Sequence, residues 1–304
     1  MKQDEKVSFY HYSSVDSTQD EAKRILSSLH SNSNKGSESS CISISASTQH
    51  KGRGTSGRTW MSRTGNTFVS IAVPTTSIPV PLTLLPLKIG SIMAFYTKEF
   101  LQSEECSSTK KKASVTLKWP NDVLINHEKV AGVLIESASD SDNNTWFIIG
   151  VGVNVAFAPI VDADGPNRGR KSACLQQYCV DHDSTSASSS SGGDNGWSNG
   201  EKAKELAERI SREVANWVVT TSSSSSSSSS SQQQQQYGKI HSAHSKAVVE
   251  EWSNWVEWGK ELTMRDPPNE NQLVIPLDVE PDGRLKVRDV NTGMEKLLVA
   301  DYLL

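Results

Sequence analysis

The sequence predicts a mixed α/β fold that is followed by a small β domain. Apolar, β-branched stretches of strand length alternate with amphipathic helical segments through most of the chain of 304 residues. From Gly259 onward only short strand patterns remain, and Asp282-Gly283 and Asn291-Thr292-Gly293 mark turns between them. We therefore expect an α/β domain over residues 1–258 and a small β domain over residues 259–304 that packs on it.

The N-terminal part has the pattern of a strand, a helix and a second strand. Residues 7–12 combine aromatic and apolar side chains and predict the first strand. A helix is expected to begin near Thr18, because Thr18 and Glu21 form a capping-box pattern and the two preceding residues are alternative caps. Apolar residues then recur at helical spacing. The alternating stretch 41–47 predicts the next strand.

The rest of the chain continues this alternation. Residues 67–73 are apolar and β-branched enough for a strand, which Pro74 ends, and apolar residues at helical spacing predict a helix from Leu85 to Phe100. Turn residues between β-branched runs predict a hairpin further on. The remaining expected strands are 115–119, 123–125, 130–136, 146–155, 261–264, 273–279, 285–290 and 296–304, and the remaining expected helices are 201–219 and 244–256.

Two low-complexity inserts interrupt the predicted α/β domain. Serine, glycine and asparagine dominate near residues 184–200, and runs of serine and glutamine fill the region near residues 220–238. Such tracts cannot bury enough apolar surface to offset the entropy of ordering the chain. We therefore expect both inserts to be disordered.

Composition and charge exclude several classes of protein. The formal net charge is −4 and the isoelectric point is about 6.0, so the chain as a whole is no general nucleic-acid binder. It has no apolar run of about 18 residues, so we expect no membrane span. The N-terminus carries acidic residues and lacks the apolar core of a targeting peptide, and we expect a cytoplasmic location. The four cysteines form no Cys-x-x-Cys pair and suggest neither a zinc site nor a disulfide framework.

The segment from Gln49 to Trp60, here called the basic loop, indicates an anionic ligand. It holds three glycines, a lysine and two arginines directly after a predicted strand. Glycine lets the backbone approach a ligand closely, and successive N–H groups form a cradle for an anion. Arg53 and Arg58 add guanidinium groups that suit phosphate or carboxylate. Considered alone, the segment is also compatible with a solvated surface turn.

Three further stretches become informative when they are considered together with the basic loop. They are Asp16-Ser17-Thr18-Gln19, then Lys118-Trp119-Pro120-Asn121-Asp122, and finally Lys129-Val130-Ala131-Gly132 with Gly150-Val151-Gly152-Val153-Asn154. In this order the motifs resemble those of the biotin–protein ligases (holocarboxylase synthetases). The resemblance extends from about Ser8 to the C-terminus, apart from the Ser/Gln inserts. It implies a class II synthetase-like catalytic domain with a mixed sheet and an SH3-like C-terminal β domain.

The resemblance implies an ATP-dependent biotin–protein ligase. Such an enzyme activates biotin to biotinyl-5′-AMP with release of pyrophosphate and then transfers biotin to a lysine of an acceptor domain. Short hydroxyl and amide side chains suit the ureido ring of biotin, which is rich in donors and acceptors. The implied biotin-binding residues are Ser17, Thr18, Gln19, Gln49, Arg53, Gly54, Thr55, Trp60, Lys129 and Gly132.

The same resemblance implies a nucleotide side to the site. The expected catalytic residues Arg53, Lys118 and Lys129 would offset the repulsion between the biotin carboxylate and the α-phosphate and stabilise the transition state. Asp122 is expected to support Mg²⁺. The implied ATP-binding residues are Arg53, Arg58, Lys118, Asn121, Asp122, Gly150, Gly152 and Asn154.

The implied partners are the biotin carboxyl-carrier domains of biotin-dependent carboxylases, and the chain is expected to be a monomer or a homodimer. We expect no membrane partner. We also expect no DNA partner, because the first motif begins at Asp16 and leaves no room for the DNA-binding domain of some relatives. A lipoate–protein ligase or octanoyl transferase of the same fold is the first alternative. The Lys-Trp-Pro-Asn-Asp motif and the C-terminal β domain favour biotin. A non-enzymatic nucleic-acid-binding Gly/Arg-loop protein is the second alternative, and it would need more stacking aromatics than Trp60 near the loop.

Overall fold

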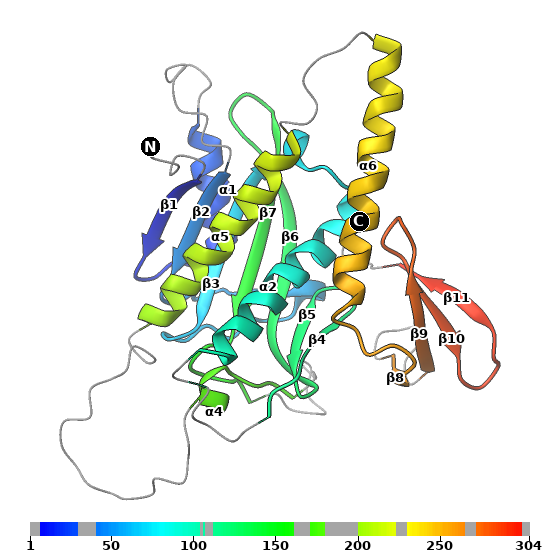
Figure 1. The fold of residues 1–304 in the computed structure, drawn as a ribbon. Coiled ribbons are helices and arrows are strands. Elements are labelled where there is room, and N and C mark those ends of the chain that lie inside the picture. The colour runs from blue at the N-terminus through cyan, green and yellow to red at the C-terminus, as the bar shows by residue number, and fades with distance from the viewer. Residues whose placement is uncertain are drawn as a thin grey trace, which may run out of the picture.

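The computed structural model contains two β-sheets and the helices that pack against them (Figure 1). It describes residues 7–29, 41–103, 106, 112–160, 171–179, 200–222, 230–264 and 272–299. The predicted mixed α/β class with a separate C-terminal β-sheet is confirmed. The domain boundary after residue 258 stays a prediction.

The elements lie close to the predicted ranges. The strands of the larger sheet are β1 (Val7–Tyr12), β2 (Cys41–Ala46), β3 (Thr67–Pro74), β4 (Val115–Lys118), β5 (Asp122–Ile125), β6 (Glu128–Ser139) and β7 (Thr145–Val153). The smaller sheet consists of β8 (Leu262–Thr263), β9 (Leu273–Val279), β10 (Leu285–Asp289) and β11 (Glu295–Leu298). The α-helices are α1 (Thr18–Ser28), α2 (Leu85–Leu101), α4 (Gln176–Cys179), α5 (Glu201–Ser222) and α6 (Ser230–Ser253).

The larger sheet is mixed. Its strand order is β1-β2-β3-β7-β6-β5-β4, with β1 parallel to β2 and every other neighbouring pair antiparallel. The smaller sheet has the order β11-β10-β9-β8 and is antiparallel. The strands β6 and β7, which are adjacent in the sequence, therefore pair with each other in the middle of the larger sheet.

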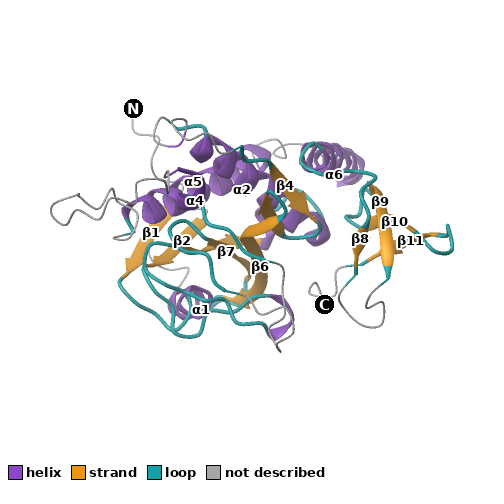
Figure 2. Ribbon diagram, turned by 90° about the horizontal axis from the view of Figure 1, so that it is seen from below, coloured by secondary structure: helices purple, strands orange, loops and turns teal. Residues whose placement is uncertain are grey.

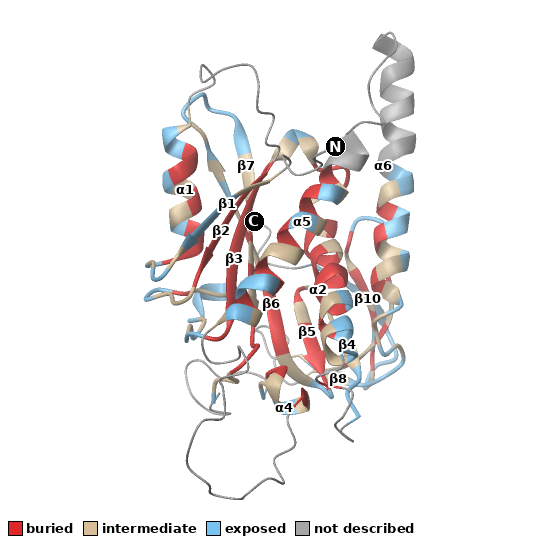
Figure 3. Ribbon diagram, turned by 60° about the vertical axis from the view of Figure 1, so that its left-hand side comes forward, coloured by how far each residue is buried: buried red, intermediate tan, exposed pale blue. Residues whose placement is uncertain are grey.

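Helices cover both faces of the larger sheet, as the view in Figure 2 shows. On one face α1 buries Ile25 and Leu26 against Ile44 and Ile148. On the opposite face α2 and α5 cover the main apolar core, and the central strands are buried between the two layers (Figure 3). Because both faces are covered, all six residues of β2 are buried.

The helix α1 begins at a side-chain cap. Ser17 has an extended backbone (φ −156°, ψ 136°), and its hydroxyl accepts a hydrogen bond from the N–H of Gln19 at 3.2 Å. Ser17 is therefore the cap among the alternatives that the sequence left open. Asp20 and Glu21 lie in the first turn, where negative charge interacts favourably with the helix dipole. The cap also leaves Thr18 buried beside the sheet.

The smaller sheet packs against the larger part of the protein beside the Lys-Trp-Pro-Asn-Asp motif. The indole Nε1 of Trp119 donates a hydrogen bond to the carbonyl oxygen of Gly283 at 3.0 Å. Val287 of β10 belongs to the same apolar core as Trp252 of α6. At Gly283 the backbone has φ +85°, and an added Cβ would lie 2.8 Å from the carbonyl oxygen of Thr83. The contact therefore depends on a glycine at this position.

The expectation of disorder near residues 220–238 stays a prediction, although helices extend into part of that tract. The helix α5 extends to Ser222, and α6 begins at Ser230, so that the run of glutamines is helical. Glutamine is among the residues of favourable helix propensity, and α6 continues into the segment that packs on α2. The expected insert near 184–200 lies almost wholly outside the described residues. None of the described helices has the length and hydropathy that a membrane span requires.

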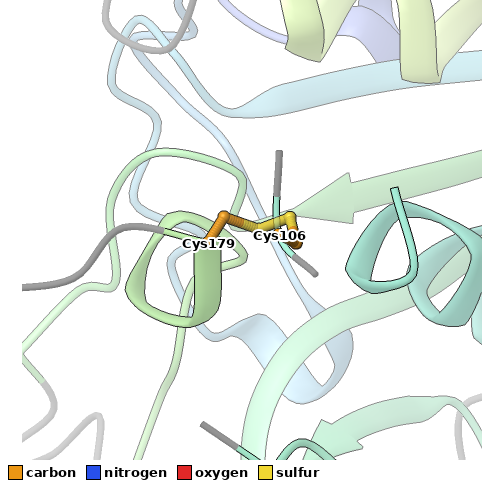
Figure 4. Close-up of a disulfide and its surroundings, with 2 residues drawn as sticks. All are labelled: Cys106 and Cys179. Carbon is orange, nitrogen blue, oxygen red and sulfur yellow. A yellow bond between two sulfur atoms is a disulfide. The ribbon is translucent and has the colours of Figure 1, made fainter. Parts of the chain in front are cut away.

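The cysteine pattern did not suggest a disulfide framework, but the structure contains one disulfide among the described residues. Cys106 and Cys179 are joined by a disulfide that connects the chain beyond α2 to α4 (Figure 4). The two residues are 73 positions apart, and no spacing motif connects them in the sequence. Only the packing of α4 beside the end of α2 brings them together.

Gly283→Ala should destabilise the protein by about 1–3 kcal/mol, because the new Cβ would meet the Thr83 carbonyl and the positive φ disfavours a side chain. Gly293→Ala is the matched control, since Gly293 also has a positive φ (+70°) but nothing lies within 4 Å of its Cβ position. Thermal unfolding of the two variants should show the larger loss for Gly283→Ala. Equal losses would contradict the steric argument.

Candidate functional site

A cavity lies on the α1 side of the larger sheet, between the start of α1, the basic loop and the strands β6 and β7. The structure brings most of the predicted site residues together here. Those that line the cavity are Ser17, Thr18, Gln19, Gln49, Arg53, Gly54, Thr55, Trp60, Asn121, Lys129, Gly132, Gly150 and Gly152. The predicted residues Arg58, Lys118, Asp122 and Asn154 are not part of its lining. Phe68 and Leu134 line it as well and were not predicted.

One end of the cavity is a network of hydroxyl and amide groups. The side-chain oxygen of Gln49 accepts hydrogen bonds from the N–H of Thr18 at 2.8 Å and from its hydroxyl at 3.1 Å. The hydroxyl of Ser70 donates to the Thr18 hydroxyl at 2.8 Å, and the Gln49 amide donates to Ser62 at 3.1 Å. These bonds join the start of α1, the basic loop and β3. They hold the polar side chains in defined positions before any ligand binds.

Gln19 presents an unused acceptor at the same end. Its amide Nε2 donates to the backbone oxygens of Leu134 in β6 and Ile148 in β7, at 3.1 and 3.3 Å. Its Oε1 is buried and has no hydrogen-bond partner among the residues that the structure describes. A buried acceptor without a partner is costly, so a ligand N–H that reached it would gain binding free energy. Two other side-chain atoms in this region, Trp60 Nε1 and Asn154 Oδ1, are buried and unpartnered in the same way.

The indole of Trp60 packs against two glycine positions. A Cβ added to Gly152 would lie 2.5 Å from the indole, and one added to Gly132 would lie 3.3 Å from it. The ammonium group of Lys129 is 5.3 Å from the ring centroid, within the range of a cation–π contact. Gly150 and Gly152 are among the residues that the resemblance assigned to ATP binding. In the structure the space at Gly150 and Gly152 is taken by Gln19 and Trp60, which themselves line the cavity.

The other end of the cavity carries a partly buried ion pair. Lys129 Nζ lies 2.5 Å from the Asp122 carboxylate, whose side chain is 15% exposed, and Lys118 Nζ lies 4.0 Å from the same carboxylate. Burial raises the pKa of Asp122, but the charges of Lys129, Lys118 and Arg58 more than offset this and hold the pKa below its ordinary value. Asp122 is therefore ionised, and the cations remain close to it.

The backbone around Lys129 is held by a segment that the motifs did not include. The N–H of Lys129 donates to the oxygen of Lys171 at 2.8 Å, and its own oxygen accepts from Ala173 at 2.9 Å. The amide of Asn154 donates to the oxygen of Ala173 at 3.1 Å. Asn154 thus supports the site from behind rather than lining the cavity.

Arg53, which lines the cavity, is held by two carboxylates that the motifs did not include. Its guanidinium donates to both carboxylate oxygens of Asp20 at 2.9 and 2.7 Å, and to both oxygens of Glu136 at 2.9 Å. Sequence reasoning did not single out Asp20 or Glu136. Arg58 donates to the backbone oxygen and the hydroxyl of Thr55, at 3.1 and 2.9 Å, and so closes the tip of the basic loop.

Lys129→Met should destabilise the protein by about 1–3 kcal/mol at pH 7, because it leaves the Asp122 carboxylate buried without its nearest cation. Adding Asp122→Asn should recover part of that loss, and chemical denaturation measures both. If the single and the double variant are equally unstable, the buried charge is not the cause.

The pH dependence of the wild type gives a second check. A carboxyl whose pKa is lowered on folding stabilises the protein above its unfolded pKa of about 3.9, and this contribution is lost as the pH falls through the folded value. The Asp122→Asn part of the double variant removes that carboxyl. Its stability should therefore decline less than that of the wild type as the pH is lowered from about 5 through the acid range.

Comparison with known proteins links this site to one family. Residues 13–154 match the Biotin/lipoate A/B protein ligase family. The chain is 33% identical over 123 residues to a biotin–[acetyl-CoA-carboxylase] ligase of Paracoccus denitrificans, an alignment that covers 40% of this chain and 48% of that protein. It is 30% identical over 116 residues to the bifunctional ligase/repressor BirA of Escherichia coli, covering 38% of this chain and 33% of the relative. The chain thus matches half or less of the length of these relatives.

Solved structures show the same fold over nearly the whole chain. The biotin protein ligase of Leishmania major in complex with biotinyl-5-AMP matches with a TM-score of 0.54 and 23% identity, over 96% of this chain and 99% of that one. The biotin protein ligase of Aquifex aeolicus in complex with biotin and ATP also has a TM-score of 0.54, at 19% identity, with 96% and 99% coverage. The family match over residues 13–154 includes every residue that lines the cavity. Residues 13–154 of this chain are thus similar to the Biotin/lipoate A/B protein ligase family.

Proposed function

We propose that this protein is an ATP-dependent biotin–protein ligase. The observation that carries the proposal is the cavity itself, which has a hydroxyl and amide network with a buried, unpartnered acceptor at one end and Lys129 at the other. Biotin has a matching distribution of groups, with N–H donors and a carbonyl on its ureido ring, an apolar chain and a terminal carboxylate. The family match and the ligase structures of the same fold support this assignment.

In the proposed binding mode the ureido ring lies against the start of α1. Gln19 Oε1 would accept a ureido N–H, and Ser17 and Thr18 would lie beside the rest of the ring. The thioether ring and the valeryl chain would follow the indole of Trp60, and the carboxylate would approach Lys129. A lipoyl dithiolane ring has no N–H to offer to Gln19, so the geometry favours biotin over lipoate.

The proposed first step joins biotin to the nucleotide. An oxygen of the biotin carboxylate attacks the α-phosphorus of ATP, and the bond to pyrophosphate breaks. Lys118 and Lys129 would reduce the repulsion between the two anions and stabilise the charge of the transition state. In the second step the amine of an acceptor lysine attacks the acyl carbon, loses a proton, and AMP leaves.

Magnesium is part of this proposal. Its role when bound would be to neutralise charge on the phosphates. Among the described residues no group of three His, Cys, Asp or Glu side chains could hold a metal. Asp122 offers one carboxylate, and Mg²⁺ commonly binds through one or two carboxylates together with substrate phosphates. The residues present therefore fit an ion that Asp122 shares with the nucleotide.

The proposed acceptor is the biotin carboxyl-carrier domain of a biotin-dependent carboxylase. The relative from Paracoccus denitrificans is named for ligation to acetyl-CoA carboxylase, and this supports the choice. The reaction would take place in the cytoplasm, as the composition indicates, with the chain as a monomer or a homodimer.

Biotin-dependent exchange between ATP and pyrophosphate tests the first step, and transfer of labelled biotin to a purified carboxyl-carrier domain tests the second. We expect both activities with biotin and neither with lipoate. Exchange that depends on lipoate alone would identify a lipoate ligase and overturn the proposal.

A further inference from the structure

The most heavily paired cation at the cavity is Arg53 in the basic loop. Four hydrogen bonds of 2.7–2.9 Å join its Nε, Nη1 and Nη2 atoms to the carboxylates of Asp20 and Glu136. Lys23 adds an ion pair to Glu136 at 2.9 Å. These four residues are called the Arg53 cluster below. Asp20 and Lys23 come from α1, and Glu136 comes from the middle of β6, so the cluster joins three separate elements.

The charges within the Arg53 cluster balance. Two cations face two carboxylates, and both carboxylates bind the guanidinium through both of their oxygens. Hydrogen bonds from Arg53 lower the pKa of Asp20. Burial raises the pKa of Glu136, but the hydrogen bonds from Arg53 and Lys23 more than offset it and lower the pKa overall. An incoming phosphate would have to displace carboxylates that already neutralise the guanidinium.

The backbone of the basic loop carries this constraint to Trp60. The N–H of Trp60 donates to the oxygen of Gly52 at 2.9 Å, and the N–H of Gly54 donates to the oxygen of Arg58 at 2.7 Å. Arg53 lies between these two bonds and is bridged to Thr59 across the loop. When the Arg53 side chain is fixed to α1 and β6, the loop is therefore fixed above the glycine positions on which the indole lies.

We propose that Asp20 and Glu136 are positioning residues that hold the basic loop closed over the cavity through Arg53. Arg53 then acts as the attachment point of the loop and not as a ligand of the adenylate phosphate, which changes the role that the sequence motif implied. The expected effect of these residues on catalysis rests on the function proposed above. Their expected effect on the opening of the basic loop does not depend on that function.

The two roles of Arg53 predict opposite effects for Glu136→Gln. If Arg53 attaches the loop, the variant loosens the loop and behaves like Arg53→Gln. If Arg53 binds phosphate, removal of a competing carboxylate frees the guanidinium and lowers the KM for ATP. Lys23→Met is the matched control, because it removes the other cation from Glu136 and leaves all four Arg53 hydrogen bonds in place.

Hydrogen–deuterium exchange of the peptide that spans the basic loop, in the ligand-free protein, is the first measurement. We expect about tenfold faster exchange in Glu136→Gln and in Arg53→Gln, because both break the same half-buried charged contacts, and no faster exchange in Lys23→Met. The double variant should exchange no faster than Arg53→Gln alone, since residues that act through one contact are not additive. Unchanged exchange in Glu136→Gln, or additive effects in the double variant, would overturn the proposal.

Kinetics of biotin-dependent ATP–pyrophosphate exchange are the second measurement. Glu136→Gln should raise the KM for biotin about tenfold with a smaller change in kcat, because an open loop weakens the cover over the ligand without removing Lys129. A lower KM for ATP in this variant would refute the attachment role. If the wild-type protein shows no biotin-dependent exchange, the proposed function fails, and the hydrogen-exchange result alone decides the role of the Arg53 cluster.

Discussion

The site depends on three glycines, which leave one face of the larger sheet without side chains at their positions. At Gly132, Gly150 and Gly152 the strands β6 and β7 present bare backbone toward α1. Gln19 occupies the space that a Cβ would need at Gly150, Trp60 does so at Gly152, and Lys129 and Trp60 crowd that position at Gly132. All three side chains line the cavity. Glycine weakens a strand, but β6 and β7 are central strands with neighbours on both sides, which offsets this cost.

Opposite charges are arranged as separate pairs around the cavity. Lys129 lies against Asp122 at one end, and Arg53 lies between Asp20 and Glu136 at the rim. In both cases a carboxylate keeps a cation in one position within a partly buried environment. Such pairs add little net stability, because desolvation cancels much of the attraction, but loss of one partner is costly. Their main consequence is therefore a defined geometry for the basic side chains.

The smaller sheet is connected directly to this arrangement. Trp119, which bonds to Gly283 of the β9–β10 turn, stands between Lys118 and the turn that leads to Asp122. A shift of the smaller sheet would therefore be transmitted to the residues that surround the partly buried ion pair. The apolar core also continues from α2 and α6 into β9 and β10, so the two sheets are packed as one body around Trp252.

The sequence by itself determined the order of strands and helices, the fold class and most of the residues that line the cavity. Periodicity and capping are properties of residues close together in the sequence, and each motif is a short continuous stretch. Ser17, Gln49 and Lys129 could therefore be recognised without a structure. The partners of Arg53 could not, because Asp20 and Glu136 lie 33 and 83 positions away. Only the register of the sheet and the packing of α1 place them together, as only the packing of α4 forms the disulfide. Which atoms face one another across the fold was decided by the tertiary structure, because sequence patterns report neighbours along the chain and not neighbours in space.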